Sequence, residues 1–284
     1  MKKYIKIAQT LVEALPYIKE FNNKIVVVKY GGSIGTDDFL KFAKDIILMK
    51  LVGIKPIVVH GGGPEISKAL KLKKIPSNFI DGLRVTCSET IKIVESILWK
   101  TINKKIVNKI KENGLKSIGL CGKNKELLLV KKFKPKKNID IGRVGEIIKV
   151  NKSLIKNYLD SDYIPVITPL GINKEGLTFN INADNAASKI ASSLKAEKLI
   201  ILTNVRGIKD QNNNLISSLT KRSANSLINK GIIEKGMVPK VGCLVDALTN
   251  GVKKAHIIDG RTDNAIILEM FTDSGIGTEI LLRG

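Results

Sequence analysis

The strongest constraint on the fold is a regular alternation of short apolar runs with longer segments of helical character. Six runs of strand length are rich in β-branched residues, and they span residues 25–29, 56–60, 117–120, 164–168, 199–203 and 256–259. Helix-like segments lie between several of them, at residues 37–51, 64–72, 88–113, 152–159 and 182–194. Near-continuous apolar strands that alternate with helices are typical of a parallel sheet covered on both faces. We therefore expect an α/β fold, a three-layer αβα sandwich with a mainly parallel central sheet.

Two regions stand outside this alternation. Residues 1–21 carry apolar side chains at helical spacing, namely Tyr4, Ala8, Leu11, Leu15 and Ile18. Acidic residues in this segment and the lack of a long apolar stretch argue against a targeting peptide, so we expect an amphipathic helix. Residues 127–133 and 145–150 have the pattern of two strands of a surface hairpin.

The composition limits the class of protein. A hydrophobic content of 43% in 284 residues suits a folded protein with a large core, and no apolar run has the length of a membrane span. Cys87, Cys121 and Cys243 do not form a C-x-x-C pair. This sparse set favours ordinary buried thiols in a reducing compartment.

The net charge of +22 permits two interpretations. A basic protein can bind nucleic acid. However, lysine is spread over every segment and outnumbers arginine, and aromatic residues make up only 5% of the chain. Lysine, asparagine and isoleucine are all abundant, and AT-rich codons encode all three. We therefore attribute the positive charge to drift of the amino-acid composition in an AT-rich genome and expect no nucleic-acid partner. Such genomes occur in plastids and in reduced bacteria, which predicts the plastid stroma or a bacterial cytoplasm as the location.

Two glycine turns follow the first two apolar runs. Gly31-Gly32 comes after the stretch KIVVVKY, and His60 is followed by Gly61-Gly62-Gly63. In open α/β sheets ligands bind beyond the carboxyl ends of the strands, where exposed amides at a helix start suit an anion. Either turn alone could be a simple tight reversal, since glycine allows unusual backbone conformations. Two such turns at equivalent strand ends favour an anionic ligand.

The first turn also contains a serine hydrolase pattern. Residues 31–35 read G-x-S-x-G with Ser33 in the centre, and the later HGGG resembles an oxyanion loop. In hydrolases of that type the oxyanion loop precedes the serine in the chain, whereas here it follows. A Walker A motif is absent as well. The hydrolase interpretation is therefore a remote alternative to phosphoryl transfer.

Two polar groups further along the chain support phosphoryl transfer. Asn180, Asn182 and Asp184 alternate before a helical stretch, so their side chains point the same way from an extended segment. Asp184 could cap the helix or could hold a lysine ammonium. Lys240 lies near the predicted start of another helix, where the helix dipole disfavours a cation. A cation in that position suggests that an anion binds beside it, whereas Lys240 taken without the other motifs reads as one more solvated lysine.

Together these segments resemble the amino acid kinase family. Nine segments match in order along nearly the whole chain: VVVKYGGS, VVHGGGPEI, DGLRVT, GRVGEI, YIPVITPLG, NINADNAA, LTNVRGI, GMVPKV and HIIDGR…LEMFTDSGIGTEI. Within the family the chain is most similar to the members that act in arginine biosynthesis. The resemblance implies the amino acid kinase fold and transfer of the γ-phosphoryl of ATP to the γ-carboxylate of N-acetyl-L-glutamate. The nearest alternatives are family members that act on aspartate, glutamate or carbamate.

The resemblance also implies roles for individual residues. The catalytic set is Lys29, Lys240, Asp184, Gly32 and Gly62. The residues implied to bind N-acetyl-L-glutamate are Gly62, Gly63, Arg84, Asn180 and Asn182. The residues implied to bind the nucleotide are Asn204, Val205, Arg206, Gly207, Ile208, Lys209, Ile232, Ile233 and Glu234. Mg²⁺ would be held mainly by the phosphates, and no protein metal site is expected.

Regulation and assembly are implied in the same way. The segment 1–21 resembles the extra helix of arginine-inhibited members, which links dimers into a homohexamer, a trimer of dimers. His256, Glu269 and Gly275 match their arginine site. The expected lobes are 22–180 for N-acetyl-L-glutamate and 181–284 for the nucleotide and arginine. Binding of the PII signalling protein is left open.

Two residues depart from the pattern of the family. Cys87 follows R-V-T where aspartate is usual, and Asn204 stands where L-T-D-V is usual. The first departure affects the expected substrate loop, and the second affects the expected nucleotide loop.

Overall fold

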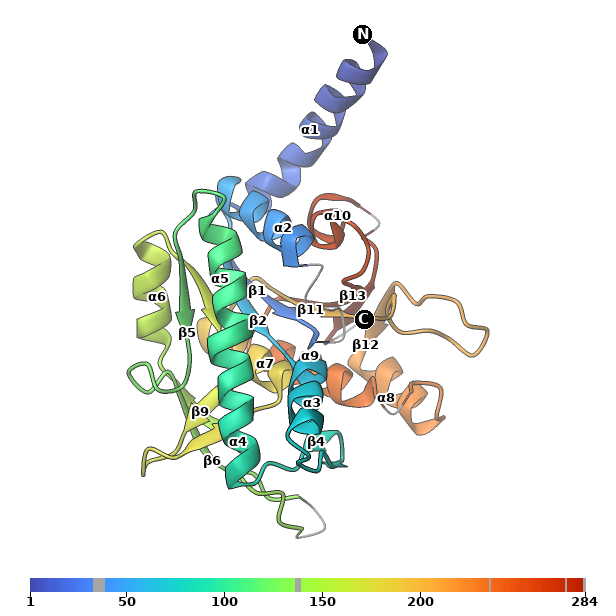
Figure 1. The fold of residues 1–284 in the computed structure, drawn as a ribbon. Coiled ribbons are helices and arrows are strands. Elements are labelled where there is room, and N and C mark those ends of the chain that lie inside the picture. Colours follow the sequence, from blue (N-terminus) through green and yellow to red (C-terminus); the bar gives the residue numbers. More distant parts are fainter. Residues whose placement is uncertain (33–38, 136–138, 235, 274, 283–284) are drawn as a thin grey trace.

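The computed structural model describes residues 1–32, 39–135, 139–234, 236–273 and 275–282 (Figure 1). Its central sheet has eight strands in the order β12-β14-β13-β11-β1-β2-β8-β5. Their bounds are β1 Ile25–Tyr30, β2 Lys55–His60, β5 Ser117–Leu120, β8 Ile164–Ile167, β11 Lys198–Thr203, β12 Ser218–Thr220, β13 Lys254–Asp259 and β14 Thr278–Leu281. All pairs are parallel except β13 with β14. The six apolar runs of the sequence are therefore all strands of one mainly parallel sheet, as predicted.

Helices cover both faces of this sheet. The α-helices of the described residues are α1 Lys2–Phe21, α2 Phe39–Leu51, α3 Gly63–Leu72, α4 Ser88–Glu95, α5 Lys104–Lys111, α6 Lys152–Asp160, α7 Ala183–Leu194, α8 Lys221–Asn229, α9 Val238–Thr249 and α10 Ala265–Phe271. Alternate residues of each strand point to opposite faces. Val27 of β1 belongs to the core formed with α6, α7 and α9, whereas Val26 and Val28 belong to the core formed with α2, α5 and α10. The two separate cores confirm the three-layer sandwich.

The predicted helix at 88–113 is continuous in extent but not regular. Its middle third, Ser96–Asn103, is π-helical and lies between α4 and α5. π-helical turns are rare and often occur at functional sites. Here the segment presses Leu98 and Ile102 against the glycine turn after β2, so it forms part of the wall of the candidate site.

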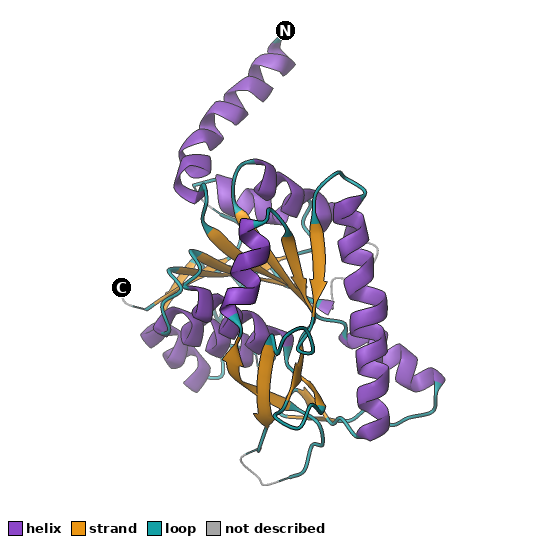
Figure 2. Cartoon of the chain, turned by 90° about the vertical axis from the view of Figure 1, so that its left-hand side faces the viewer, coloured by secondary structure: helices purple, strands orange, loops and turns teal. Residues whose placement is uncertain are grey.

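A second, smaller sheet lies beside the first, as Figure 2 shows below the central strands. Its strand order is β10-β9-β6-β7, with bounds β6 Leu128–Lys132, β7 Gly145–Val150, β9 Leu170–Ile172 and β10 Thr178–Asn180. The predicted antiparallel pairing of β6 with β7 is confirmed. Their description as a surface hairpin is wrong, because Leu128 and Val130 are buried and β9 pairs with β6. A two-stranded sheet, β3 Phe79–Ile80 with β4 Leu83–Arg84, completes the fold.

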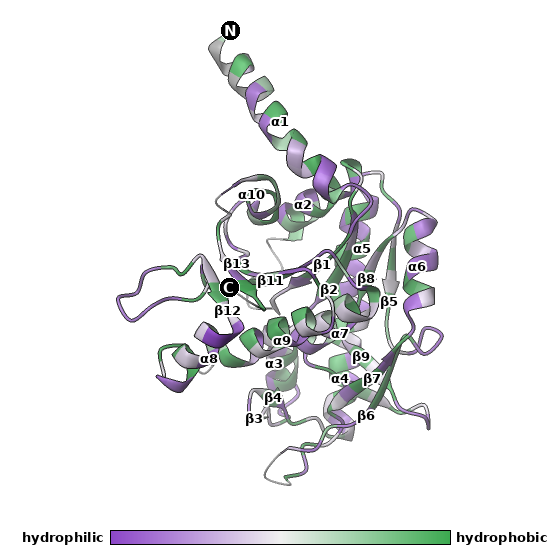
Figure 3. Cartoon of the chain, turned by 180° about the vertical axis from the view of Figure 1, so that it is seen from behind, coloured by the Kyte–Doolittle hydropathy of each residue, from purple (hydrophilic) through white to green (hydrophobic). Residues whose placement is uncertain are grey.

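The segment 1–21 forms the predicted helix, and α1 projects away from the rest of the chain (Figure 1). Hydrophobic and hydrophilic patches alternate along it in Figure 3, and Tyr4, Leu11 and Leu15 are all more than half exposed. Its last turn is anchored, since Phe21 is buried and the Tyr17 hydroxyl hydrogen-bonds the Asp273 carboxylate. In the described part of the chain, no helix combines the length and the apolar character needed to cross a membrane.

Candidate active site

A cavity of about 330 Å³ lies at the carboxyl ends of β1 and β2. All the residues that the sequence predicts for catalysis and acceptor binding line it: Lys29, Gly32, Gly62, Gly63, Arg84, Asn180, Asn182, Asp184 and Lys240. These residues come from β1, two glycine turns, β4, β10, α7 and α9. The parallel sheet brings them together because the carboxyl ends of its strands share one edge.

Asp184 joins the two predicted lysines. Lys29 Nζ lies 2.9 Å from one carboxylate oxygen and Lys240 Nζ lies 2.7 Å from the other. The side chains of Lys29 and Asp184 are both less than a tenth exposed, whereas that of Lys240 is 22% exposed. Two positive charges against one negative charge leave an excess of positive charge at the floor of the cavity. An anionic group that enters the cavity would neutralise it.

The protonation states of this cluster follow from burial and charge. Burial alone would raise the pKa of Asp184, but the charges and hydrogen bonds of Lys29 and Lys240 outweigh burial and hold that pKa at about 2. Burial also lowers the pKa of Lys29, and the attraction of Asp184 opposes this shift. Asp184 is therefore ionised at neutral pH and can hold both ammonium groups in place.

The helix cap of α7 comes from Asn182 rather than Asp184. The Asn182 side-chain oxygen accepts hydrogen bonds from the amides of Asp184, at 2.9 Å, and Asn185, at 3.1 Å. Because Asn182 satisfies these amides, the Asp184 carboxylate is free to bind the lysines. The two interpretations of Asp184 left open by the sequence are resolved in favour of the lysine contact.

The two glycine turns touch each other through their backbones. A Cβ atom at Gly32 would lie 2.8 Å from the amide nitrogen of Gly62. A Cβ at Gly62 would lie 2.4 Å from the Ile102 side chain. Any other residue at either position would force the turns or the adjoining wall apart. Glycine is thus required here for close approach of two chain segments rather than for turning the chain.

Arg84 also lines the cavity and is bound to the second glycine turn. Its Nη2 donates to the Gly63 carbonyl at 3.0 Å and to the Ser67 hydroxyl at 2.9 Å. Its guanidinium carbon lies 4.6 Å from the centre of the Phe79 ring. Burial lowers the pKa of Arg84, but an arginine stays charged at neutral pH. The side chain is thus a fixed, partly desolvated cation that faces the acceptor cavity.

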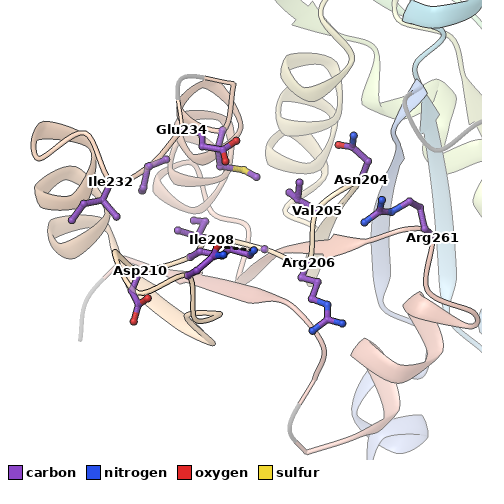
Figure 4. Close-up of a pocket in the computed structure, with 13 residues that line it drawn as sticks. Asn204, Val205, Arg206, Ile208, Asp210, Ile232, Glu234 and Arg261 are labelled. Carbon is purple, nitrogen blue, oxygen red and sulfur yellow. Dashed lines mark hydrogen bonds between the residues drawn. The ribbon is translucent and has the colours of Figure 1, made fainter.

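A second cavity, of about 350 Å³, lies beyond the carboxyl end of β11 (Figure 4). All nine residues that the sequence predicts for the nucleotide line it: Asn204, Val205, Arg206, Gly207, Ile208, Lys209, Ile232, Ile233 and Glu234. Met237 also lines it, only one turn of chain before Lys240 in the first cavity. The amino end of α9 therefore lies between the two cavities.

Sequence reasoning missed four residues that line this second cavity: Asp210, Asn213, Met237 and Arg261. Arg261 lines the wall and forms a two-point pair with Asp259, at 2.9 and 2.7 Å. It is part of the matched segment HIIDGR, but the sequence alone carries no sign that its side chain turns toward the nucleotide loop. In Figure 4 Arg261 lies on the side of Asn204, across the cavity from Ile232.

The three residues predicted for arginine meet in a third cavity, of about 240 Å³. His256 Nδ1 lies 2.5 Å from one Glu269 carboxylate oxygen, and the other oxygen accepts the Ile276 amide at 3.0 Å. Gly275 has φ +58°, and a Cβ there would lie 2.9 Å from Glu269. Burial would raise the pKa of Glu269, but His256 and Lys198 hold it at about 2. Tyr17, at the end of α1, also lines this cavity.

The two histidines that a serine hydrolase could use as its base lie at separate places in the fold. Ser33 lies outside the described residues. His60 is fully buried and its ring nitrogens lie near Gly61, Asn103 and Thr168. His256 lies in the third cavity. Among the residues described, no three His, Cys, Asp or Glu side chains are grouped as a metal site.

The amino-acid sequence is similar to those of known proteins over nearly its whole length. The sequence profile of the Amino acid kinase family matches residues 24–259. A protein named acetylglutamate kinase from Ruthia magnifica subsp. Calyptogena magnifica is 51% identical over 281 residues, which cover 96% of this chain and 95% of the relative.

The solved structures that are similar in fold include two of N-acetylglutamate synthase from Neisseria gonorrhoeae. One is complexed with coenzyme A and N-acetyl-glutamate and has 26% identity and a TM-score of 0.90. The other is complexed with coenzyme A and L-arginine and has 25% identity and a TM-score of 0.84. The matches cover 98% and 96% of this chain but only 64% and 65% of those proteins.

Proposed function

This chain belongs to the amino acid kinase family, and we propose that it phosphorylates the γ-carboxylate of N-acetyl-L-glutamate with ATP, a step of arginine biosynthesis. The observation that carries the proposal is the pair of lysine ammonium groups bound to Asp184, at the floor of the acceptor cavity and one turn from the nucleotide cavity. A relative with 51% identity that is named acetylglutamate kinase supports the choice of acceptor.

The reaction needs positive charge and amide donors but no general base. The acceptor carboxylate is already ionised at neutral pH. One of its oxygens attacks the γ-phosphorus, the bond from that phosphorus to the bridging oxygen breaks, and the products are an acyl phosphate and ADP. Lys29, Lys240 and the amides of Gly32 and Gly62 would stabilise the charge on the phosphoryl group in transit.

Mg²⁺ would accompany ATP and shield its phosphates. Asp184 is the carboxylate at the floor of the acceptor cavity, and both of its oxygens already bind lysine. This donor set suits a metal held mainly by phosphate oxygens rather than by the protein. The residues of the nucleotide cavity, from Asn204 to Lys209 and from Ile232 to Glu234, would bind the rest of ATP.

Arg84 and Asn180 would orient the acceptor. The guanidinium of Arg84 can pair with the α-carboxylate of N-acetyl-L-glutamate. Asn180 and Asn182 line the same wall, and amide side chains suit the polar acetamido group. Residues 22–180 would thus form the acceptor lobe and residues 181–284 the nucleotide lobe.

Feedback inhibition by L-arginine is proposed for the third cavity. Glu269 there is ionised and can pair with a guanidinium. The exposed apolar side chains of α1 support a homohexamer built through this helix, since an exposed apolar face indicates an interaction surface. Light scattering that gave a monomeric mass at micromolar concentration would refute the hexamer.

The function is tested by trapping the acyl phosphate with hydroxylamine in the presence of ATP and Mg²⁺. N-acetyl-L-glutamate is compared with L-glutamate, L-aspartate and carbamate as acceptors, with ADP release as the readout for carbamate. We expect kcat/KM to be highest for N-acetyl-L-glutamate by at least about 100-fold, because a site built for the acetamido group leaves polar groups unpaired without it. A preference for another acceptor would refute the proposed substrate.

A further inference from the structure

His60 is a buried polar residue with no role in the mechanism above. It ends β2, directly before the glycine turn, and its exposed fraction is 0%. Its Nδ1 lies 3.1 Å from the Gly61 carbonyl oxygen. Its Nε2 lies 3.2 Å from the Asn103 side-chain nitrogen and 3.3 Å from the Thr168 hydroxyl. Every ring nitrogen therefore has a partner.

These partners define the tautomer of the ring. A carbonyl oxygen can only accept a hydrogen bond, so Nδ1 carries the proton and donates it to Gly61. Nε2 then accepts from the Asn103 amide and from the Thr168 hydroxyl. Asn103 also donates to the Val166 carbonyl at 2.8 Å, which fixes which end of its amide faces His60. Burial lowers the pKa of His60 to about 4, so the ring is neutral at physiological pH.

The contact to Gly61 also determines where the next amide points. The Gly61 carbonyl and the Gly62 N–H belong to one planar trans peptide, in which the two groups point in opposite directions. The preceding amide, Gly61 N–H, is held by the Tyr30 carbonyl at 2.9 Å. Leu98 and Ile102 close the space beside Gly62. The remaining rotation of the Gly61–Gly62 peptide is therefore restrained by His60.

We propose that His60 is a positioning residue, which holds the Gly61–Gly62 peptide so that the Gly62 N–H points at the phosphoryl group in transit. The inference rests on the proposed function, because that function places the Gly62 amide at the reacting group. His60 itself contacts neither the acceptor nor ATP. Its effect is confined to the step in which the phosphoryl group moves.

Two substitutions test the contributions of the two ring nitrogens separately. In His60→Asn the side-chain amide nitrogen can occupy the place of Nδ1 and keep the donor to Gly61. In His60→Gln the amide reaches the place of Nε2 and leaves Gly61 without a donor. Loss of one oxyanion donor lowers kcat by about 100- to 1,000-fold in other enzymes. A Gly62 N–H that is present but misdirected should lower kcat by about 10- to 100-fold.

We therefore expect His60→Gln to lower kcat for hydroxamate formation by about 10- to 100-fold and to leave KM for the acceptor within about 2-fold of the wild type. His60→Asn should keep at least about a third of the wild-type kcat. Thr168→Val removes only a partner of Nε2 and serves as the matched control. It should lower the melting temperature but leave kcat within about 3-fold, since it removes a buried hydrogen bond and leaves the donor on Nδ1 in place.

Several results would overturn the inference. His60→Gln with wild-type kcat would do so, and so would equal losses in His60→Gln and His60→Asn at equal melting temperatures. A rise in KM without a fall in kcat would assign His60 to ground-state binding instead. The ¹⁵N shifts of the imidazole give an independent readout, and a proton on Nε2 would contradict the tautomer. Failure of the wild type with every acceptor would refute the proposed function instead.

Discussion

Lys240 Nζ lies 2.7 Å from a carboxylate oxygen of Asp184, and this contact joins the first turns of α9 and α7. Lys29 binds the second oxygen from the end of β1. A single carboxylate thus sets the distance between two cations that lie far apart in the chain. Because the helix dipole also places positive charge at both helix starts, the site attracts an anion more strongly than either lysine alone would.

Replacing Arg84 with lysine should weaken acceptor binding. A lysine keeps the charge but cannot reproduce the contacts of the guanidinium to Gly63, Ser67 and the Phe79 ring. We expect KM for N-acetyl-L-glutamate to rise by about 10- to 100-fold and KM for ATP to change by less than about 2-fold. Steady-state kinetics with each substrate varied in turn measures both. Arg222→Lys on the exposed face of α8 is the control, and equal effects of the two substitutions would contradict the assignment of Arg84.

Asp45 should make the protein less stable as the pH rises. Its carboxylate is buried on α2 and accepts the Ile266 amide at 3.1 Å. Burial raises the pKa of Asp45 from 3.8 to about 6, the Ile266 hydrogen bond opposes this, and Asp263 adds to it. A raised native pKa means that the stabilising contribution is complete below about pH 4 and is lost as the pH rises through about 6. The loss is at most about 3 kcal/mol.

The variant Asp45→Asn tests this directly. Its carbonyl can still accept the Ile266 amide, but it does not ionise. Urea unfolding at pH 4.5 and pH 7 should show a smaller loss of unfolding free energy with rising pH in the variant than in the wild type. Asp160→Asn, at a mostly exposed position, should follow the wild type within about 0.5 kcal/mol. A variant curve parallel to that of the wild type would contradict the shifted pKa.

Glu269→Gln should reduce sensitivity to L-arginine. The carboxylate loses its charge, and with it a charge-assisted pair with the guanidinium. We expect the arginine concentration for half-inhibition to rise at least about 10-fold, and the rise in melting temperature caused by arginine to shrink. Glu112→Gln, at the mostly exposed residue directly after α5, is the control. The proposed site would be contradicted if Glu269→Gln were inhibited by arginine as strongly as the wild type. It would also be contradicted if millimolar arginine left the rate of the wild type unchanged.

The main sheet was predictable because burial on both faces leaves a clear pattern. Strands such as β1 and β11 are nearly continuous runs of buried apolar residues. By contrast, β9 and β10 have three residues each, which is too short for periodicity to identify them. The π-helical segment was missed because its apolar residues also fit a regular helix. The two forms differ in their backbone hydrogen bonds, which the spacing of apolar residues does not show.

The candidate site was predictable from residue types and from the family resemblance, but its internal contacts were not. Asn182 and Asp184 both suit a helix cap, and only the structure assigns the cap to Asn182. The turn of Arg261 toward the nucleotide cavity depends on its pairing with Asp259, two residues away. The position of His60 depends on Asn103 and Thr168, which are distant in the chain. Such contacts are set by the packing of the sheet.

The most direct measurement for the central claim is kcat of the Asp184→Asn variant in the hydroxamate assay with N-acetyl-L-glutamate. Asp246→Asn is the matched control, because Asp246 also accepts a lysine between α7 and α9, at 3.0 Å from Lys189, but is 41% exposed. If Asp184 holds the two catalytic cations, its replacement lowers kcat by at least about 100-fold, whereas Asp246→Asn stays within about 3-fold of the wild type. An Asp184→Asn variant that folds and keeps more than about a tenth of the wild-type kcat would contradict the claim.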